Sequence, residues 1–150
     1  MAIVNWKDVT VRWATSWACL AAALGLHVAD EALNGFLPLY NSVVESMRET
    51  YAWVPFPTFT FPIWLGGLIT LVLVLLALTP LVLRNYRWLR GLSYFLGVIM
   101  VANAIGHMAV SIWLREFAPG VYSSPILFVA AIALLITTAQ SRRSGQNPDD

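Results

Sequence analysis

Four long apolar segments constrain the fold of this chain more than any other feature of its sequence. They cover about residues 13–33, 61–83, 91–114 and 125–141. A helix needs about 20 apolar residues to cross the hydrocarbon core of a bilayer. Hydrophobic residues make up 59% of the chain and charged residues 11%, whereas soluble domains have about 45–50% and 25%. The sequence therefore predicts an all-α, polytopic membrane protein, with four transmembrane helices bundled in one domain over residues 1–150.

The connection between the first two apolar segments carries a helical pattern of its own. Apolar residues recur at spacings of three and four, at Tyr40, Val43, Val44, Met47 and Tyr51. Glu45 and Glu49 fall between them, so the pattern predicts an amphipathic helix at about 39–52 that lies on the membrane. The ends of the chain are polar. We expect residues 1–12 to lie in water or among the headgroups, and the tail 142–150 to be disordered.

The basic residues predict the orientation of the bundle. With four spans, both termini and the second connection share one side of the membrane. That side holds seven of the nine lysine and arginine residues, namely Lys7, Arg12, Arg84, Arg87, Arg90, Arg142 and Arg143. Cytoplasmic connections are enriched in these residues. We therefore expect both termini in the cytoplasm and the amphipathic helix outside.

Net charge and cysteine content exclude some classes of function. The formal net charge is +1 and no run of basic residues occurs, so a nucleic-acid partner is not expected. Cys19 is the only cysteine, which excludes an intrachain disulfide. The partners that this composition predicts are membrane lipids and an apolar small molecule.

Three ionisable residues lie inside the first apolar segment. His27, Asp30 and Glu31 are three and four residues apart, so on a helix they share one face. Ionisable side chains are costly inside a membrane and usually have a function there. They are therefore candidate site residues.

A second polar group lies at the same predicted depth in the third apolar segment. His107 is about seven residues before the end of its helix, as is His27, which puts both roughly 10 Å below the outer surface. Asn103 lies one turn from His107 on the same face. Two polar faces at one depth are expected to meet inside the bundle, because either would otherwise face lipid.

At these residues the chain resembles the bacterial membrane family named for an HXXEE motif. The matching segments are His27-Val28-Ala29-Asp30-Glu31, Asn103-Ala104-Ile105-Gly106-His107 and the turn Phe117-Ala118-Pro119-Gly120. Asp30 stands where the motif has its first glutamate. The resemblance implies a location in the bacterial inner (plasma) membrane and supports a site at these residues, without implying a reaction.

Four interpretations of the five candidate residues remain open. In the first, His27, His107 and one carboxylate, Glu31 or Asp30, bind a divalent metal, zinc or iron, with the remaining carboxylate as a general base and Asn103 orienting a ligand. In the second, the same groups perform metal-free acid–base chemistry, as in an isomerase, cyclase or epoxide-opening enzyme. In the third, the two histidines hold haem. In the last, the polar groups only specify helix packing.

We expect the first interpretation, an integral membrane enzyme with metal-assisted hydrolytic or lyase chemistry near the outer leaflet. The location of the site favours a lipid or isoprenoid-like substrate. Two further groups of residues are given structural roles. Tryptophans near the predicted interfaces are expected to anchor the helices, at positions Trp13, Trp53, Trp64, Trp88 and Trp113. Glycines are expected to allow close helix approach, at Gly66, Gly67, Gly97 and Gly106.

Overall fold

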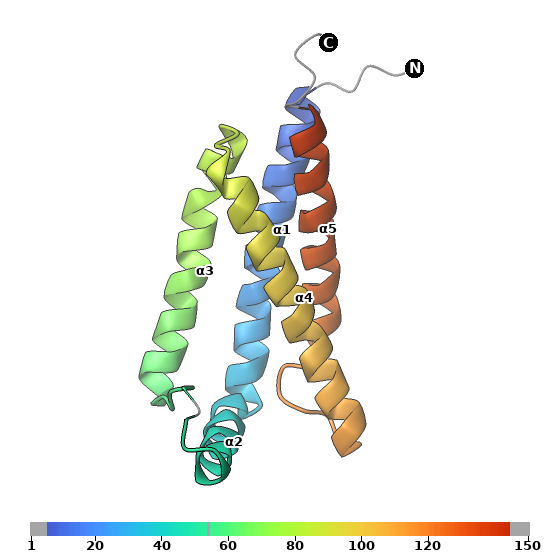
Figure 1. Ribbon diagram of the computed structural model, residues 1–150. Coiled ribbons are helices and arrows are strands. Elements are labelled where there is room, and N and C mark those ends of the chain that lie inside the picture. Colours follow the sequence, from blue (N-terminus) through green and yellow to red (C-terminus); the bar gives the residue numbers. More distant parts are fainter. Residues whose placement is uncertain (1–5, 54, 145–150) are drawn as a thin grey trace.

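The computed structural model describes residues 6–53 and 55–144, which form five helices and contain no strand. The helices are α1 (Trp6–Leu33), α2 (Phe36–Thr50), α3 (Phe61–Leu83), α4 (Trp88–Leu114) and α5 (Ser124–Ser144). Four of them, all but α2, are long and apolar enough to cross a membrane. The predicted all-α fold with four candidate spans and a helix in the first connection is therefore confirmed (Figure 1).

The helix α1 is the centre of the packing. It lies against α3 on one side and α5 on the other, and α4 packs on α5. In contrast, α3 and α4 have few contacts with each other. They are joined at one end by a short connection and diverge toward the other end, where α2 lies across the foot of the bundle (Figure 1). Helices α3 and α4 therefore do not pack on each other along their length.

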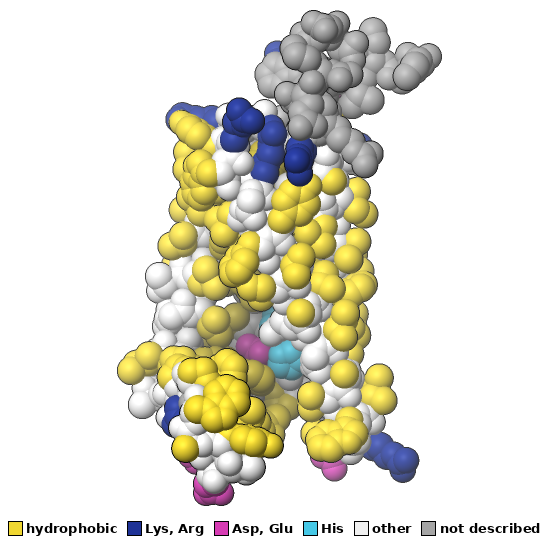
Figure 2. Space-filling model, in the orientation of Figure 1, with side chains coloured by type: hydrophobic (Ala, Val, Ile, Leu, Met, Phe, Trp, Pro, Cys, Tyr) yellow, Lys and Arg dark blue, Asp and Glu magenta, His cyan; other side chains and the backbone are white. Residues whose placement is uncertain are grey.

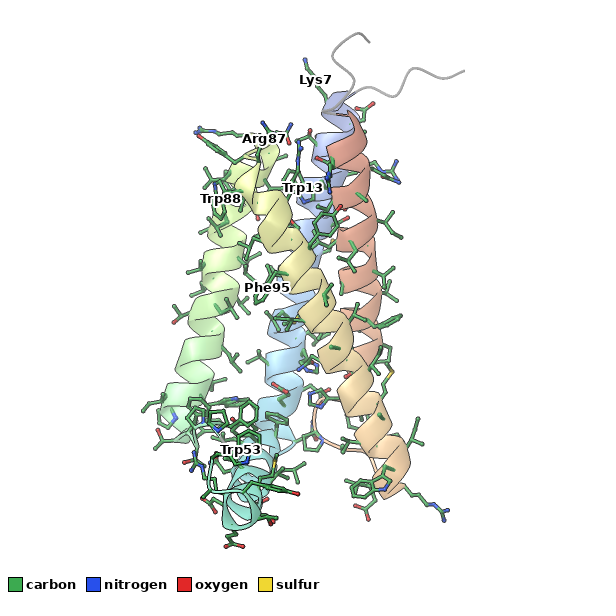
Figure 3. All side chains as sticks on the ribbon, in the orientation of Figure 1. Lys7, Trp13, Trp53, Arg87, Trp88 and Phe95 are labelled. Carbon is green, nitrogen blue, oxygen red and sulfur yellow. The ribbon has the colours of Figure 1, made fainter. Side chains whose placement is uncertain are left out.

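The two ends of the bundle differ in their side chains. One end carries Lys7, Arg87 and most other basic residues, and we call it the basic end (Figures 2 and 3). The opposite end carries α2 and Trp53, and we call it the α2 end (Figure 3). The separation of charge between them agrees with the pattern on which the predicted orientation rests.

Tryptophans of α1 form part of the core. The Trp13 and Trp17 side chains are almost fully buried. The indole N–H of Trp13 donates to Ser93 Oγ (3.0 Å), and that of Trp17 donates to the Leu75 carbonyl (2.7 Å). The prediction that Trp13 anchors the helix at the interface was therefore wrong. A tryptophan is buried readily where its N–H has a partner, and Ser93 supplies one.

The helix ends differ from those predicted because hydropathy marks a span and not the helix that contains it. Helix α1 begins at Trp6, seven residues before the predicted start of the span. Val9 and Thr10 are already buried there, so residues 6–12 do not simply lie in water. Helix α5 continues to Ser144, beyond the predicted end at 141. The rest of the predicted disordered tail, 145–150, lies outside the described residues.

Helix α2 has two apolar faces. Leu37 and Val44 are buried against the bundle, whereas Val43 and Met47 are exposed on the protein surface. The helix starts at Phe36 rather than 39, with Gly35 in a left-handed conformation (φ 78°) closing the turn from α1. The predicted membrane-facing stripe is thus divided, because Val44 is buried in the protein while Val43 and Met47 are exposed.

The glycines have unequal roles. A Cβ on Gly97 would lie 2.6 Å from the Leu135 side chain, so this glycine permits the close approach of α4 and α5. Nothing lies within 4 Å of the corresponding positions of Gly66, Gly67 and Gly106. The prediction of close helix approach is therefore confirmed at Gly97 and wrong, within the described chain, at the other three.

Candidate metal centre

Three ionisable side chains from two helices meet near the α2 end of the bundle. Glu31 lies one turn after His27 on α1, and its Oε1 is 3.5 Å from His27 Nε2. The same oxygen lies 3.1 Å from Nε2 of His107, which comes from α4. All three residues are buried. We call this group the ligand cluster, since one potential ligand atom from each residue falls within 4.8 Å of the others.

The turn between α4 and α5 fixes the orientation of His27. The Ser123 hydroxyl donates to Asp30 Oδ2 (2.7 Å), so its oxygen accepts the hydrogen bond of His27 Nδ1 (2.8 Å). A neutral imidazole has one N–H, and here the network assigns it to Nδ1. The remaining lone pair is on Nε2, which faces Glu31 and has no hydrogen-bond partner among the described residues.

The same turn fixes His107 in the same way. Its Nδ1 lies 2.6 Å from the Pro119 carbonyl, which can only accept, so Nδ1 carries the proton. In the neutral form of His107, its Nε2 therefore also presents a lone pair to Glu31 Oε1. With both imidazoles neutral, two lone pairs and a carboxylate oxygen, all acceptors, converge on one point. A cation or a proton placed among them removes the repulsion between these acceptors.

Asp30 lies beside the cluster and not in it. Its Oδ2 also accepts the backbone N–H of Ser123 (2.9 Å), and its Oδ1 accepts from Asn34 Nδ2 (2.7 Å). Both oxygens are thus occupied by donors. The carboxylate holds Ser123, and through Ser123 it holds His27. This arrangement suits an orienting role, and the general-base role expected of one carboxylate stays a prediction.

Gly120 allows the turn to reach both histidines. Its backbone is left-handed (φ 86°), a conformation that favours glycine. A Cβ at this position would lie 2.7 Å from His107 Nδ1 and 3.0 Å from His27 Cε1. The Pro119-Gly120 pair of the predicted turn was the sequence signal for this approach. That signal did not identify Ser123, which is 96 residues from His27 and 93 residues from Asp30 in the chain.

Asn103 is placed differently from the other candidates. It precedes His107 by one turn of α4, and its Oδ1 is buried without a hydrogen-bond partner among the described residues. No hydrogen bond joins it to a member of the ligand cluster within the described chain. Of the five candidate residues, the structure thus brings His27, Glu31 and His107 into one cluster, with Asp30 orienting it and Asn103 one turn away.

The two distances from Glu31 to the histidines fit a small metal ion. Two ligands of a tetrahedral zinc lie about 2.05 Å from the metal, which puts them about 3.3 Å from each other. The two distances from Glu31 Oε1, 3.1 and 3.5 Å, bracket that value. Metal-bound histidines usually donate their other N–H to a carboxylate, carbonyl or water, and both histidines here have such orienting partners.

The geometry favours a small ion over haem. Two axial histidines bind haem iron from opposite faces of a wide porphyrin. Here the imidazole rings touch edge to face, with centroids 4.8 Å apart, and both Nε2 atoms face the same carboxylate. The ring of Phe36, the first residue of α2, lies 5.4 Å from that of His107. A porphyrin would need these rings to separate.

One side of the cluster is open to the surface. Figure 2 shows a hollow between α3 and α4, just above α2, in which acidic and histidine atoms are visible among apolar side chains. The exposed fraction of His107 is 8%, compared with 1% for His27. The hollow therefore leads to the His107 side of the cluster.

Comparison with known protein families identifies a match over most of the chain. A family model described as a protein of unknown function with an HXXEE motif matches residues 17–135. The matched range includes every member of the ligand cluster and the turn that orients it. Neither the curated proteins nor the solved structures give a match.

Proposed function

Because the chain belongs to the family of proteins of unknown function with an HXXEE motif, we propose its function from its own site: a membrane metalloenzyme. His27 Nε2, one Glu31 oxygen and His107 Nε2 are the proposed ligands. Two imidazoles and a carboxylate suit zinc or non-haem iron, and leave a coordination position for water or substrate.

The observation that carries this proposal is the pair of fixed imidazoles. Each Nδ1 is bound to an oriented acceptor, Ser123 Oγ for His27 and the Pro119 carbonyl for His107. With both rings neutral, each Nε2 presents a lone pair to the same carboxylate oxygen. Three acceptors then surround one point, which is the arrangement that a metal ion binds.

We infer hydrolytic or lyase chemistry on an apolar, lipid or isoprenoid-like substrate. An ion with an open position can polarise a carbonyl or activate a water molecule. The second oxygen of Glu31 could handle a proton, and the Asn103 amide, one turn from His107 on α4, could orient the substrate. The basic end is proposed to face the cytoplasm of a bacterial inner membrane, which puts the cluster near the outer leaflet.

A specific contact supports a second candidate, metal-free acid–base chemistry. The 3.1 Å distance between His107 Nε2 and Glu31 Oε1 also suits a hydrogen bond with a shared proton. A histidine–carboxylate pair of this kind can move a proton in an isomerisation or cyclisation. The metal content of the protein separates the two candidates.

The test is metal analysis of protein purified in detergent without added metal or chelator. We expect about one zinc or iron per chain, since a three-ligand site binds one ion. His27→Ala and His107→Ala should each abolish stoichiometric binding, because each removes a ligand. Ser93→Ala is the matched control, a buried polar residue that contacts Trp13 and not the cluster. A parent protein without metal, or a histidine variant that keeps it, would overturn the metal proposal.

A further inference from the structure

We propose that the opening between α3 and α4 is a binding site for a single membrane lipid, which reaches the ligand cluster sideways from the outer leaflet. We call this opening the wedge. It is bounded by α1 behind and by α2 at its foot (Figure 1). The reaction at the cluster rests on the proposed function, whereas the binding of the lipid does not require a metal.

The other approaches to the cluster are closed. Helix α1 supplies His27 and Glu31 and forms the rear wall. On the α5 side, the turn brings Gly120 against both imidazoles. At the foot, Phe36 covers His107, and its ring also lies 6.1 Å from that of Trp64 on α3. A substrate therefore reaches the cluster between α3 and α4, where Figure 2 shows the hollow.

Gly106 lies on the rim of the wedge. Gly97 faces α5, as its contact with Leu135 shows. Gly106 follows Gly97 by nine residues, which at about 100° per residue is two and a half turns of the helix. Gly106 is therefore on the side of α4 opposite to Gly97, away from α5. Nothing lies within 4 Å of its Cβ position. The space beside His107 on this side is thus free of other side chains in the described chain.

The walls of the wedge select an apolar occupant. Helix α3 has the highest mean hydropathy of the four candidate spans, 2.5, and only 11% of that segment is buried in the bundle. Aromatic rings of Phe36, Tyr40 and Trp64 line the foot. Helices α3 and α4 converge toward their connection (Figure 1). A helix of a second copy, about 10 Å wide throughout, therefore cannot lie between them along their whole length, whereas a flexible lipid chain can enter where they diverge.

The depth of the cluster indicates which part of the lipid reacts. His107 precedes the end of α4 at Leu114 by seven residues, which corresponds to roughly 10 Å. The headgroup layer on each side of a bilayer is about 5–8 Å thick. The cluster is therefore level with the top of the hydrocarbon, where acyl ester carbonyls lie, and below the phosphates. We assign a lipid ester, or an isoprenoid group at that depth, as the reacting group.

Photocrosslinking in native membranes tests the wedge. The photoreactive residue p-benzoylphenylalanine replaces Phe36, and lipid adducts are identified by mass spectrometry after irradiation. The same residue at Val129, which is exposed on α5 five residues after its start, reports ordinary lipid contact. The Gly106→Trp variant fills the rim of the wedge. Gly91→Trp, also with free space around it on α4, is the matched control.

We expect Gly106→Trp to remove most of the lipid adduct at position 36 and to leave the adduct at 129 unchanged. Gly91→Trp should change neither. An adduct at 36 that persists in Gly106→Trp would overturn the proposal, and so would a crosslink from 36 to a second copy of the chain. Metal content is measured on the same samples. Loss of the adduct without any bound metal in the parent would refute only the proposed function.

Discussion

At the scale of single residues, the site depends on a serine that touches neither a substrate nor an ion. Ser123 connects Asp30 to His27, because its hydroxyl donates a hydrogen bond to the carboxylate and accepts one from the imidazole. Aspartate alone would not reach His27 Nδ1 in this arrangement, because Ser123 stands between them. Asp30 and Ser123 are therefore positioning residues for the ligand cluster.

Ser123→Ala should weaken metal binding without abolishing it. Removing an orienting partner of a metal-bound histidine typically lowers affinity about 10–100-fold. The neighbouring Ser124→Ala is the control, since the Ser124 hydroxyl donates to the Gly120 carbonyl and contacts no imidazole. Competition with a metal-binding dye measures both affinities. Equal affinities in the two variants would show that Ser123 does not orient His27.

Residue chemistry explains how much of the site could be predicted from the sequence. His27, Glu31 and His107 were predicted because ionisable groups at one depth inside apolar segments must face each other. Asp30 was predicted with them because it shares their face of the helix. That face could not reveal that Ser123 hydrogen-bonds the Asp30 carboxylate. Serines are common at helix starts, so Ser123 carried no signal until the turn was folded against α1.

At the scale of elements, two turns with left-handed glycines have different tasks. Gly35 joins α1 to α2 and has nothing within 4 Å of its Cβ position. Gly120 joins α4 to α5 and lies against both imidazoles. The first turn needs only the backbone conformation, whereas the second also needs the absence of a side chain.

Gly35→Ala and Gly120→Ala should separate these two requirements. Both place a side chain in a left-handed conformation, which costs about 1–2 kcal/mol of folding stability. Gly120→Ala adds a clash with the histidines, which should cost about 1–3 kcal/mol more and lower the metal content. Thermal unfolding in detergent, with metal analysis, measures both effects. Matching losses in the two variants would mean that the turn can move away from the imidazoles.

The elements themselves were largely predictable, and their ends were not. The segment 61–83 was predicted as α3 has it, because Pro55 and Pro57 interrupt any helix before it and Arg84 and Asn85 follow it. Helix α1 was predicted too short, because residues 6–12 are polar enough for the headgroup layer and still helical. The division of α2 into two apolar faces depends on how α2 packs against α1. The spacing of apolar residues within α2 carries no information about that packing.

At the scale of the whole molecule, charge separates the two ends. The basic end holds the arginines of the α3–α4 connection, and the opposite end holds α2 and the ligand cluster (Figure 2). This polarity gives the proposed orientation and, with it, the leaflet from which the wedge would take its lipid.

Reporter fusions should place both termini in the cytoplasm and residues near 48 and 118 outside. The physical reason is the retention of arginine and lysine on the cytoplasmic side during insertion. Alkaline phosphatase and a cytoplasmic fluorescent reporter at the same positions give opposite signals, which controls for expression. A C-terminus found outside would reverse the orientation and move the cluster to the inner leaflet.

The long sequence separation between His27 and Ser123 has a consequence for biosynthesis. The two positions are 96 residues apart, so a ribosome adding ~5–20 residues per second needs roughly 5–20 s to pass from one to the other. During that time Asp30 lacks the two hydrogen bonds that Ser123 donates to it, and His27 lacks the partner of its Nδ1. The first helix to be made therefore depends on the turn before the last helix for the orientation of its histidine.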